Sequence, residues 1–140
     1  MITNERGMTL VEVMVAVAII TVGLTAIATG MHLATAGINQ GQQETTAAFL
    51  AEQRLEDIKA FALSTAAGQG FANVNAANFP AEAYGTIAGG YGGYRRTTTV
   101  TNPSATITVV VVRVFYMPVG VSHVTNNERE VAVSTVLRER

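Results

Sequence analysis

Glu12 is the residue of the amino-terminal stretch whose type and position best suit chemistry. No side chain from Val13 to Met31 is charged, so this carboxylate stands at the start of a long apolar run. A lone charge in lipid costs at least about 2.5–3.5 kcal/mol at the bilayer centre and less near its surface. If the chain is cut after Gly7, Met8 carries a free amine, which is mostly protonated at neutral pH. On a helix this amine lies one turn from Glu12, and in an assembly it can face the Glu12 of a neighbour.

The other polar residues form no catalytic or metal-binding motif that we recognise. His32 and His123 are too isolated for a metal pair or a triad. Glu52 and Glu56 are adjacent at i, i+4, which can suggest acid chemistry, but a solvated helix face explains them better. Residues 126–128 lack the spacing of a calcium loop, and the chain has no cysteine for disulfides or thiol chemistry. We therefore expect no enzyme activity, no metal and no cofactor.

The apolar run after Glu12 is long enough to span a membrane as a helix. At about 1.5 Å per residue, Val13–Met31 nearly matches the roughly 30 Å of bilayer hydrocarbon. No Lys or Arg occurs between Gly7 and Arg54, whereas Arg6 precedes the run. By the positive-inside rule the amino terminus stays in the cytoplasm, and the remainder faces the periplasm or the outside.

The residues Gly7-Met8-Thr9-Leu10-Val11-Glu12 resemble, position by position, the class III leader of type IV pilins and type II secretion pseudopilins. That family combines a short polar leader ending in Gly, a cut, and a long apolar helix with Glu near its start. The resemblance implies that a prepilin peptidase cuts between Gly7 and Met8 and methylates the Met8 amine. It also implies that Thr9 and Glu12 take part in assembly. The alternative is an ordinary signal anchor that contains Glu by chance.

Small residues recur along the apolar helix. Ala16, Gly23, Gly30 and Gly37 follow one another at seven-residue spacing. Such stripes let helix backbones approach closely, and we interpret this one as a packing face against sister helices in a filament core. The alternative is that Ala and Gly are simply common in spanning helices.

The sequence turns polar from Asn39, where we place the exit from the membrane. An apolar face then continues at alternating three- and four-residue steps, through Ala48, Ala51, Leu55, Ile58 and Ala62. This spacing predicts an amphipathic helix, so that one helix runs from about Thr9 to Ser64.

Residues 66–93 are rich in Ala, Asn and Gly, and they predict a long surface loop. Tyr91 and Tyr94 either contact neighbouring subunits or pack on the edge of a sheet. Three strands are expected after the loop, with turns at 102–105 and 126–127; they are Tyr94–Thr101, Thr106–Met117 and Glu130–Leu137. The second strand has apolar residues on both faces, which indicates a central strand with a helix on one side.

The fold class predicted is therefore α+β. A long amino-terminal helix, whose first half spans the membrane, packs on a small antiparallel sheet of three or four strands, as in type IV pilins. The net charge of -1 provides no global attraction to nucleic acid. Arg95, Arg96 and Arg113 suggest a small basic patch, but aromatic residues hardly interleave with them, and we do not expect nucleic-acid binding.

The predicted organisation is a leader at 1–7, a transmembrane and filament-core helix at 8–38, and an amphipathic helix with a periplasmic sheet domain at 39–140. A second resemblance, of Gly23-Leu24 and Phe49–Lys59, is to minor pilins of the PilV type. It implies a structural minor pilin of a type IV pilus or its tip and priming complex. The alternatives are a minor pseudopilin of a type II secretion system and a membrane-anchored periplasmic binding domain that does not polymerise.

The resemblance also implies the chain's partners and location. The partners are other pilin or pseudopilin subunits, the prepilin peptidase and an inner-membrane assembly platform. The expected location is the bacterial inner membrane as a single-pass protein, and the pilus or pseudopilus after assembly.

Overall fold

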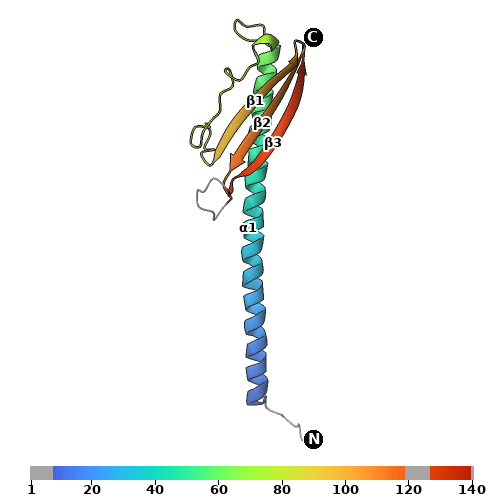
Figure 1. Cartoon of the computed structure of the whole chain (residues 1–140). Helices are drawn as coiled ribbons and strands as arrows, with labels where there is room; N and C mark the ends of the chain where they lie inside the picture. The colour runs from blue at the N-terminus through green and yellow to red at the C-terminus, as the bar shows by residue number, and fades with distance from the viewer. Residues whose placement is uncertain (1–7, 119–126, 140) are drawn as a thin grey trace, which may run out of the picture. The chain divides into compact units, whose positions relative to one another are not determined.

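The computed structural model describes residues 8–118 and 127–139, and in them an α+β fold (Figure 1). The chain divides into two compact units, one ending at Ile38 and the other beginning at Asn39. The elements in chain order are α1 (Leu10–Leu63), the 3₁₀ helix η1 (Phe71–Asn73), β1 (Tyr94–Ser104), β2 (Ile107–Tyr116) and β3 (Arg129–Arg138). The predicted fold class, a long helix packed on a small antiparallel sheet, is confirmed.

The three strands form one antiparallel sheet in the order β1-β2-β3, so β2 is central as its sequence predicted. The register places Val112 of β2 opposite Thr98 of β1 and Val133 of β3. Alternate β2 side chains from Thr108 to Tyr116 are buried, whereas β3 buries its inward-facing side chains only partly. The core is therefore deepest under β2 and becomes shallow towards β3.

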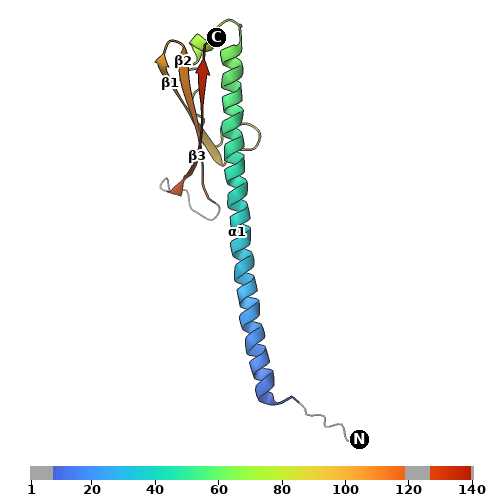
Figure 2. The same ribbon diagram turned by 90° about the vertical axis from the view of Figure 1, so that its right-hand side faces the viewer.

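The core of the second unit lies between the sheet and the α1 residues from Ala47 to Ile58 (Figure 2). Leu50 and Ile58 are fully buried against the valines of β2. The predicted apolar face is slightly rotated, because Ala47 and Leu50 belong to the core while Ala48 and Ala62 are only half-buried. Steps of three and four residues still bring these side chains to one face of the helix.

The β1–β2 hairpin differs from the turn that Pro103 suggested. β1 continues to Ser104, and the turn itself is Ala105-Thr106. The strand register shifts between Thr101 and Ser104. Proline has no N–H to donate to a strand ladder. The shift in register therefore accommodates Pro103 within β1, and the turn follows it at Ala105-Thr106.

The segment before the sheet is not only a surface loop, and this part of the prediction was wrong. Val74, Phe79 and Ile87 are buried in the core, and the backbone of Glu82 forms a two-way bridge with Arg96 of β1. Tyr94 lies 6.0 Å from Tyr116 between ring centroids, which favours packing at the sheet over subunit contact. Apolar side chains spaced this irregularly carry no periodic signal, so composition alone suggested solvent exposure.

At the carboxyl-terminal end of α1, which is Leu63, the Phe61 carbonyl finds partners outside the helix. The Phe61 carbonyl accepts hydrogen bonds from the N–H groups of Ser64 at 3.2 Å and Gly70 at 3.0 Å. Gly70 has a φ of 99°, in the region that glycine tolerates and other residues rarely adopt. The returning loop thus satisfies the helix end, in the manner of a carboxyl-terminal cap.

Candidate processing and assembly site

The described chain places Thr9 and Glu12 together in a reciprocal cap at the start of α1. The Glu12 carboxylate accepts hydrogen bonds from the Thr9 N–H at 3.0 Å and from the Thr9 hydroxyl at 3.2 Å. In return, the Glu12 N–H donates to Thr9 Oγ1 at 3.3 Å. This is a capping box, which satisfies N–H groups that the first helical turn leaves without partners. A carboxylate there also lies at the positive end of the helix dipole.

The sequence prediction gives Glu12 a partner only in the Met8 amine, whereas the structure adds Thr9 as its capping partner. The signal was present in the sequence, because a Thr followed three residues later by Glu before an apolar run is typical of a capping box. Gly7 and the leader lie outside the described residues, as do His123 and Asn126. Met8 is described and is 69% exposed, which leaves its side chain accessible.

The amino-terminal unit exposes nearly all of its apolar side chains. α1 contains an 18-residue window with a mean hydropathy of 2.5, and none of that window is buried. A core helix of a soluble protein can reach this hydropathy, but it is buried by its own domain. By length and composition this helix is able to cross a membrane, and its bare apolar surface fits membrane anchoring.

The polar side chains within this apolar segment satisfy their own hydrogen bonds. Thr21, Thr25 and Thr29 lie one turn apart, and each hydroxyl donates to the carbonyl four residues earlier at 2.8–2.9 Å. A hydroxyl in lipid without a partner is costly, so this back-bonding makes the threonines tolerable there. None of the three hydroxyls needs a neighbouring helix as an acceptor.

The stripe of small residues faces open space within the single chain. A side chain built at Gly23, Gly30 or Gly37 meets nothing within 4 Å outside its own helix. Another helix therefore has room to approach the backbone closely along the stripe. A role of the stripe in helix packing stays a prediction.

The three arginines of the predicted basic patch, Arg95, Arg96 and Arg113, are not free, because each has an acidic partner in the described part of the chain. Arg96 is 6% exposed, and its Nε donates to Glu82 Oε2 at 2.6 Å while its Nη1 donates to the Leu50 carbonyl at 2.8 Å. Burial alone would raise the pKa of the Glu82 carboxyl, but the hydrogen bond and charge of Arg96 outweigh it and lower that pKa. The other pairs are Arg95–Glu128 and Arg113–Glu130.

Glu128 connects β1 to the segment that precedes β3. Its carboxylate accepts hydrogen bonds from Arg95 Nε at 3.0 Å and from the Tyr84 hydroxyl at 2.9 Å. The Arg95 guanidinium also lies over the ring of Phe115, 3.8 Å from its centroid. The hydrogen bond from Arg95 lowers the pKa of Glu128 despite some desolvation. These contacts join four segments of the domain, namely the loop at Tyr84, β1, β2 and the residues before β3, and they present no free acid–base pair.

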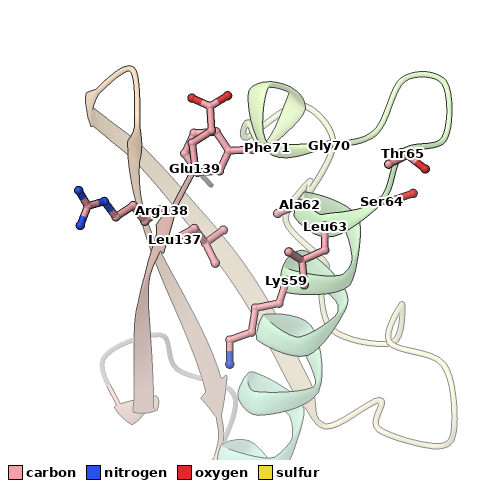
Figure 3. A pocket seen from close by; sticks show the side chains of 10 residues that line it. All are labelled: Lys59, Ala62, Leu63, Ser64, Thr65, Gly70, Phe71, Leu137, Arg138 and Glu139. Carbon is pink, nitrogen blue, oxygen red and sulfur yellow. The ribbon is translucent and has the colours of Figure 1, made fainter.

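A groove runs between α1 and β3 in the carboxyl-terminal unit. One end is a cavity of about 530 Å³, lined by Ala62, Leu63, Phe71 and Leu137 with charged residues at its rim (Figure 3). Leu137 points from β3 towards α1, and Arg138 points away (Figure 3). A second hollow of about 330 Å³ shares Lys59 and continues past Leu55 to Val133. Within the described residues, no three metal-binding side chains cluster in this groove or elsewhere.

Comparison with known proteins identifies the amino-terminal motif. Residues 2–28 match the family model of the prokaryotic N-terminal methylation motif. The chain carries a type IV pilin-like class III signal. The match covers about a fifth of the chain, and proteins that carry this motif are structural rather than enzymatic precursors. No curated protein and no solved structure matches the chain significantly.

Proposed function

We propose that this chain is a structural minor pilin. A prepilin peptidase cuts the precursor between Gly7 and Met8 and methylates the new amine, and the subunit then enters a type IV pilus or its tip and priming complex. The observation that carries the proposal is the methylation motif at residues 2–28, directly continuous with an apolar helix that the chain itself leaves bare. The mature subunit crosses the inner membrane once, with its sheet domain in the periplasm, and binds other pilins and the assembly platform.

The resemblance of Gly23-Leu24 and Phe49–Lys59 to PilV-type minor pilins supports a pilus over a secretion pseudopilus. In the structure, Phe49 is 52% exposed on the part of α1 that turns away from the sheet core. A pseudopilin would use the same physics with different partners, so co-purified subunits distinguish the two. A monomeric binding domain would need neither the cut nor the partners.

Processing is the decisive test of this proposal. Intact-mass analysis of the membrane protein, from cells with and without a prepilin peptidase, should show loss of residues 1–7 and addition of one methyl group only when the enzyme is present. Gly7→Val should block the cut, because a bulky β-branched residue replaces a small one, whereas Gly7→Ala is the matched conservative change. An uncut Met1 form in both strains would refute the assignment.

A further inference from the structure

The outer edge of β3 is open in the described part of the chain. β3 pairs only with β2, whereas the outer edge of β1 is met at Arg96 by the backbone of Glu82. An open edge presents a row of backbone donors and acceptors that another strand can pair with. The groove between α1 and β3 runs directly beside this edge, and the inward side chains of β3 are only half-buried there. Edge and groove together form a surface suited to an added strand.

The charges of β3 indicate which strand fits. A cation and an anion stand at each end, Arg129-Glu130 and Arg138-Glu139, with only uncharged residues between them. When the same sequence is laid antiparallel to itself about Ser134, Arg129 faces Glu139 and Glu130 faces Arg138. A parallel copy in register would instead set each charge against its like, which is destabilising. An edge strand that carries charges of only one sign would repel a second copy of itself in either orientation. The mixed charges of β3 repel only the parallel copy.

We propose that the edge of β3 is a contact site for a second copy of this chain, paired antiparallel about Ser134. The remaining positions also match, because Val131 then faces Leu137 and Ala132 faces Val136. Eleven residues, from Arg129 to Glu139, enter the pairing. Their ladder supplies about ten hydrogen bonds, the number typical of a specific protein interface.

The α1 helices of the two copies also carry opposite charges that this two-fold axis brings together. Ser134 lines the same hollow as Glu52 and Lys59, which lie seven residues, about two helical turns, apart on α1. Rotation about Ser134 therefore brings Lys59 of one copy towards Glu52 of the other. The two grooves become one space, which the half-buried side chains of both β3 strands close.

The pairing is antiparallel for the domains as well as for the strands. In an antiparallel pair, the Asn39 ends of the two domains lie at opposite ends of the joined sheet. The contact therefore joins two domains that run in opposite directions, and it does not depend on which filament the chain enters.

A single introduced cysteine tests the register, because the natural chain has none. In the detergent-solubilised full chain, Ser134→Cys places two thiols across the axis. Their Cα atoms are about 4.5–5.5 Å apart, within the range of a disulfide. Ala132→Cys and Val136→Cys, on the same face of the strand, separate their like residues by about 13 Å. After mild oxidation, only Ser134→Cys should give a cross-linked dimer on a non-reducing gel. Equal cross-linking at all three positions, or none at Ser134→Cys, overturns the proposal.

A charge swap in the Ser134→Cys chain tests the cause. Arg129→Glu or Glu139→Arg alone creates two like-charged contacts and should slow cross-linking about five- to tenfold. The two changes together restore opposite charges and should restore the rate. Neither residue belongs to an ion pair within the described chain, and both are exposed, so thermal unfolding should stay unchanged in every variant. A double variant that cross-links no faster than the single ones refutes the charge-matched pairing.

Discussion

Glu12 has one acceptor role in the structure and a second in the proposed assembly, and both would use the same carboxylate. In the described chain it caps the first turn through Thr9, and after a cut at Gly7 the Met8 amine becomes a charged donor one residue earlier. The cap makes the subunit tolerable alone, because the carboxylate is not left without hydrogen bonds at the start of the apolar run. In the proposed assembly, a neighbour's amine would replace or join Thr9, because the attraction between opposite charges is strong where water is scarce.

Two substitutions separate these roles. Glu12→Gln keeps an acceptor for Thr9 but loses the charge, and Glu12→Val loses both. If pairing with a neighbour's amine drives recruitment, both variants should accumulate normally in the inner membrane and both should be lost from sheared filaments. Immunoblots of membrane and sheared fractions provide the measurement. Entry of Glu12→Gln at the wild-type level would show that Glu12 acts only as a cap.

Glu128 makes the stability of the domain depend on pH. Its pKa in the folded state is lowered by Arg95 from an ordinary value of 4.5, so the unfolded state binds more protons as the pH falls. The stabilisation is complete above about pH 4.5 and is lost as the pH falls through the lower folded value. Urea unfolding between pH 6 and 3 should show a shallower loss in Glu128→Gln than in the wild type. The slope should not vanish, since the pKa of Glu82 is shifted in the same direction. Identical pH profiles would contradict the assignment.

At the level of elements, the periodicity of apolar residues predicted which strand is central and which face of α1 is buried. Apolar residues on both faces of the second strand identified β2 as the central strand, and the three- and four-residue steps after Asn39 placed the buried face of α1 within one residue. Partners distant in the sequence left no such signal. Arg96 finds Glu82 and the Leu50 carbonyl only because the fold brings the three together. Phe79 is buried because the loop crosses the end of α1, where it meets Phe61 at 5.1 Å between ring centroids.

The face of α1 that contacts the sheet should contribute most of the stability of the domain. Leu50 is 0% exposed, and Leu50→Ala removes buried methyl groups and leaves a cavity, for an expected cost of about 2–5 kcal/mol in the free energy of unfolding. Phe49→Ala, on the neighbouring exposed position, is the matched control and should cost less than about 0.5 kcal/mol. Urea unfolding monitored by circular dichroism measures both. Equal effects would mean that α1 does not dock on the sheet through this face.

At the scale of the whole molecule, the two compact units suit different surroundings, one apolar and one aqueous. Unit one exposes Val, Ile and Leu along its length, whereas unit two buries its apolar residues against a sheet of its own. The fold class and the membrane segment were predictable from composition and periodicity. The first unit is a continuous apolar run, and the second places its apolar residues at helix and strand spacing. The capped helix start was also predictable, because Thr9 and Glu12 have the spacing of a capping box.

A fragment that starts at Gln40 should therefore be soluble, folded and insensitive to reductant. It retains the whole buried core and loses the exposed apolar helix, and it has no disulfide to reduce. Circular dichroism should show a cooperative thermal transition with the same midpoint with and without dithiothreitol. A fragment without such a transition would show that the first unit is needed for the second to fold.

The open glycines of α1 give the chain a place to lengthen under load. Gly30, Gly37 and Gly41 lie where no other part of the chain contacts them, and each weakens the helix by up to about 1 kcal/mol relative to alanine. The residues from Ala47 onwards are instead tied to the sheet. A pull along the chain should therefore uncoil Gly30–Gly41 before it disturbs the domain. Each uncoiled residue gains about 2 Å, the difference between helical rise and extended backbone, so this stretch alone yields roughly 20–25 Å of extension. We therefore expect a chain under sudden tension to lengthen in this stretch first, while its folded sheet domain stays intact.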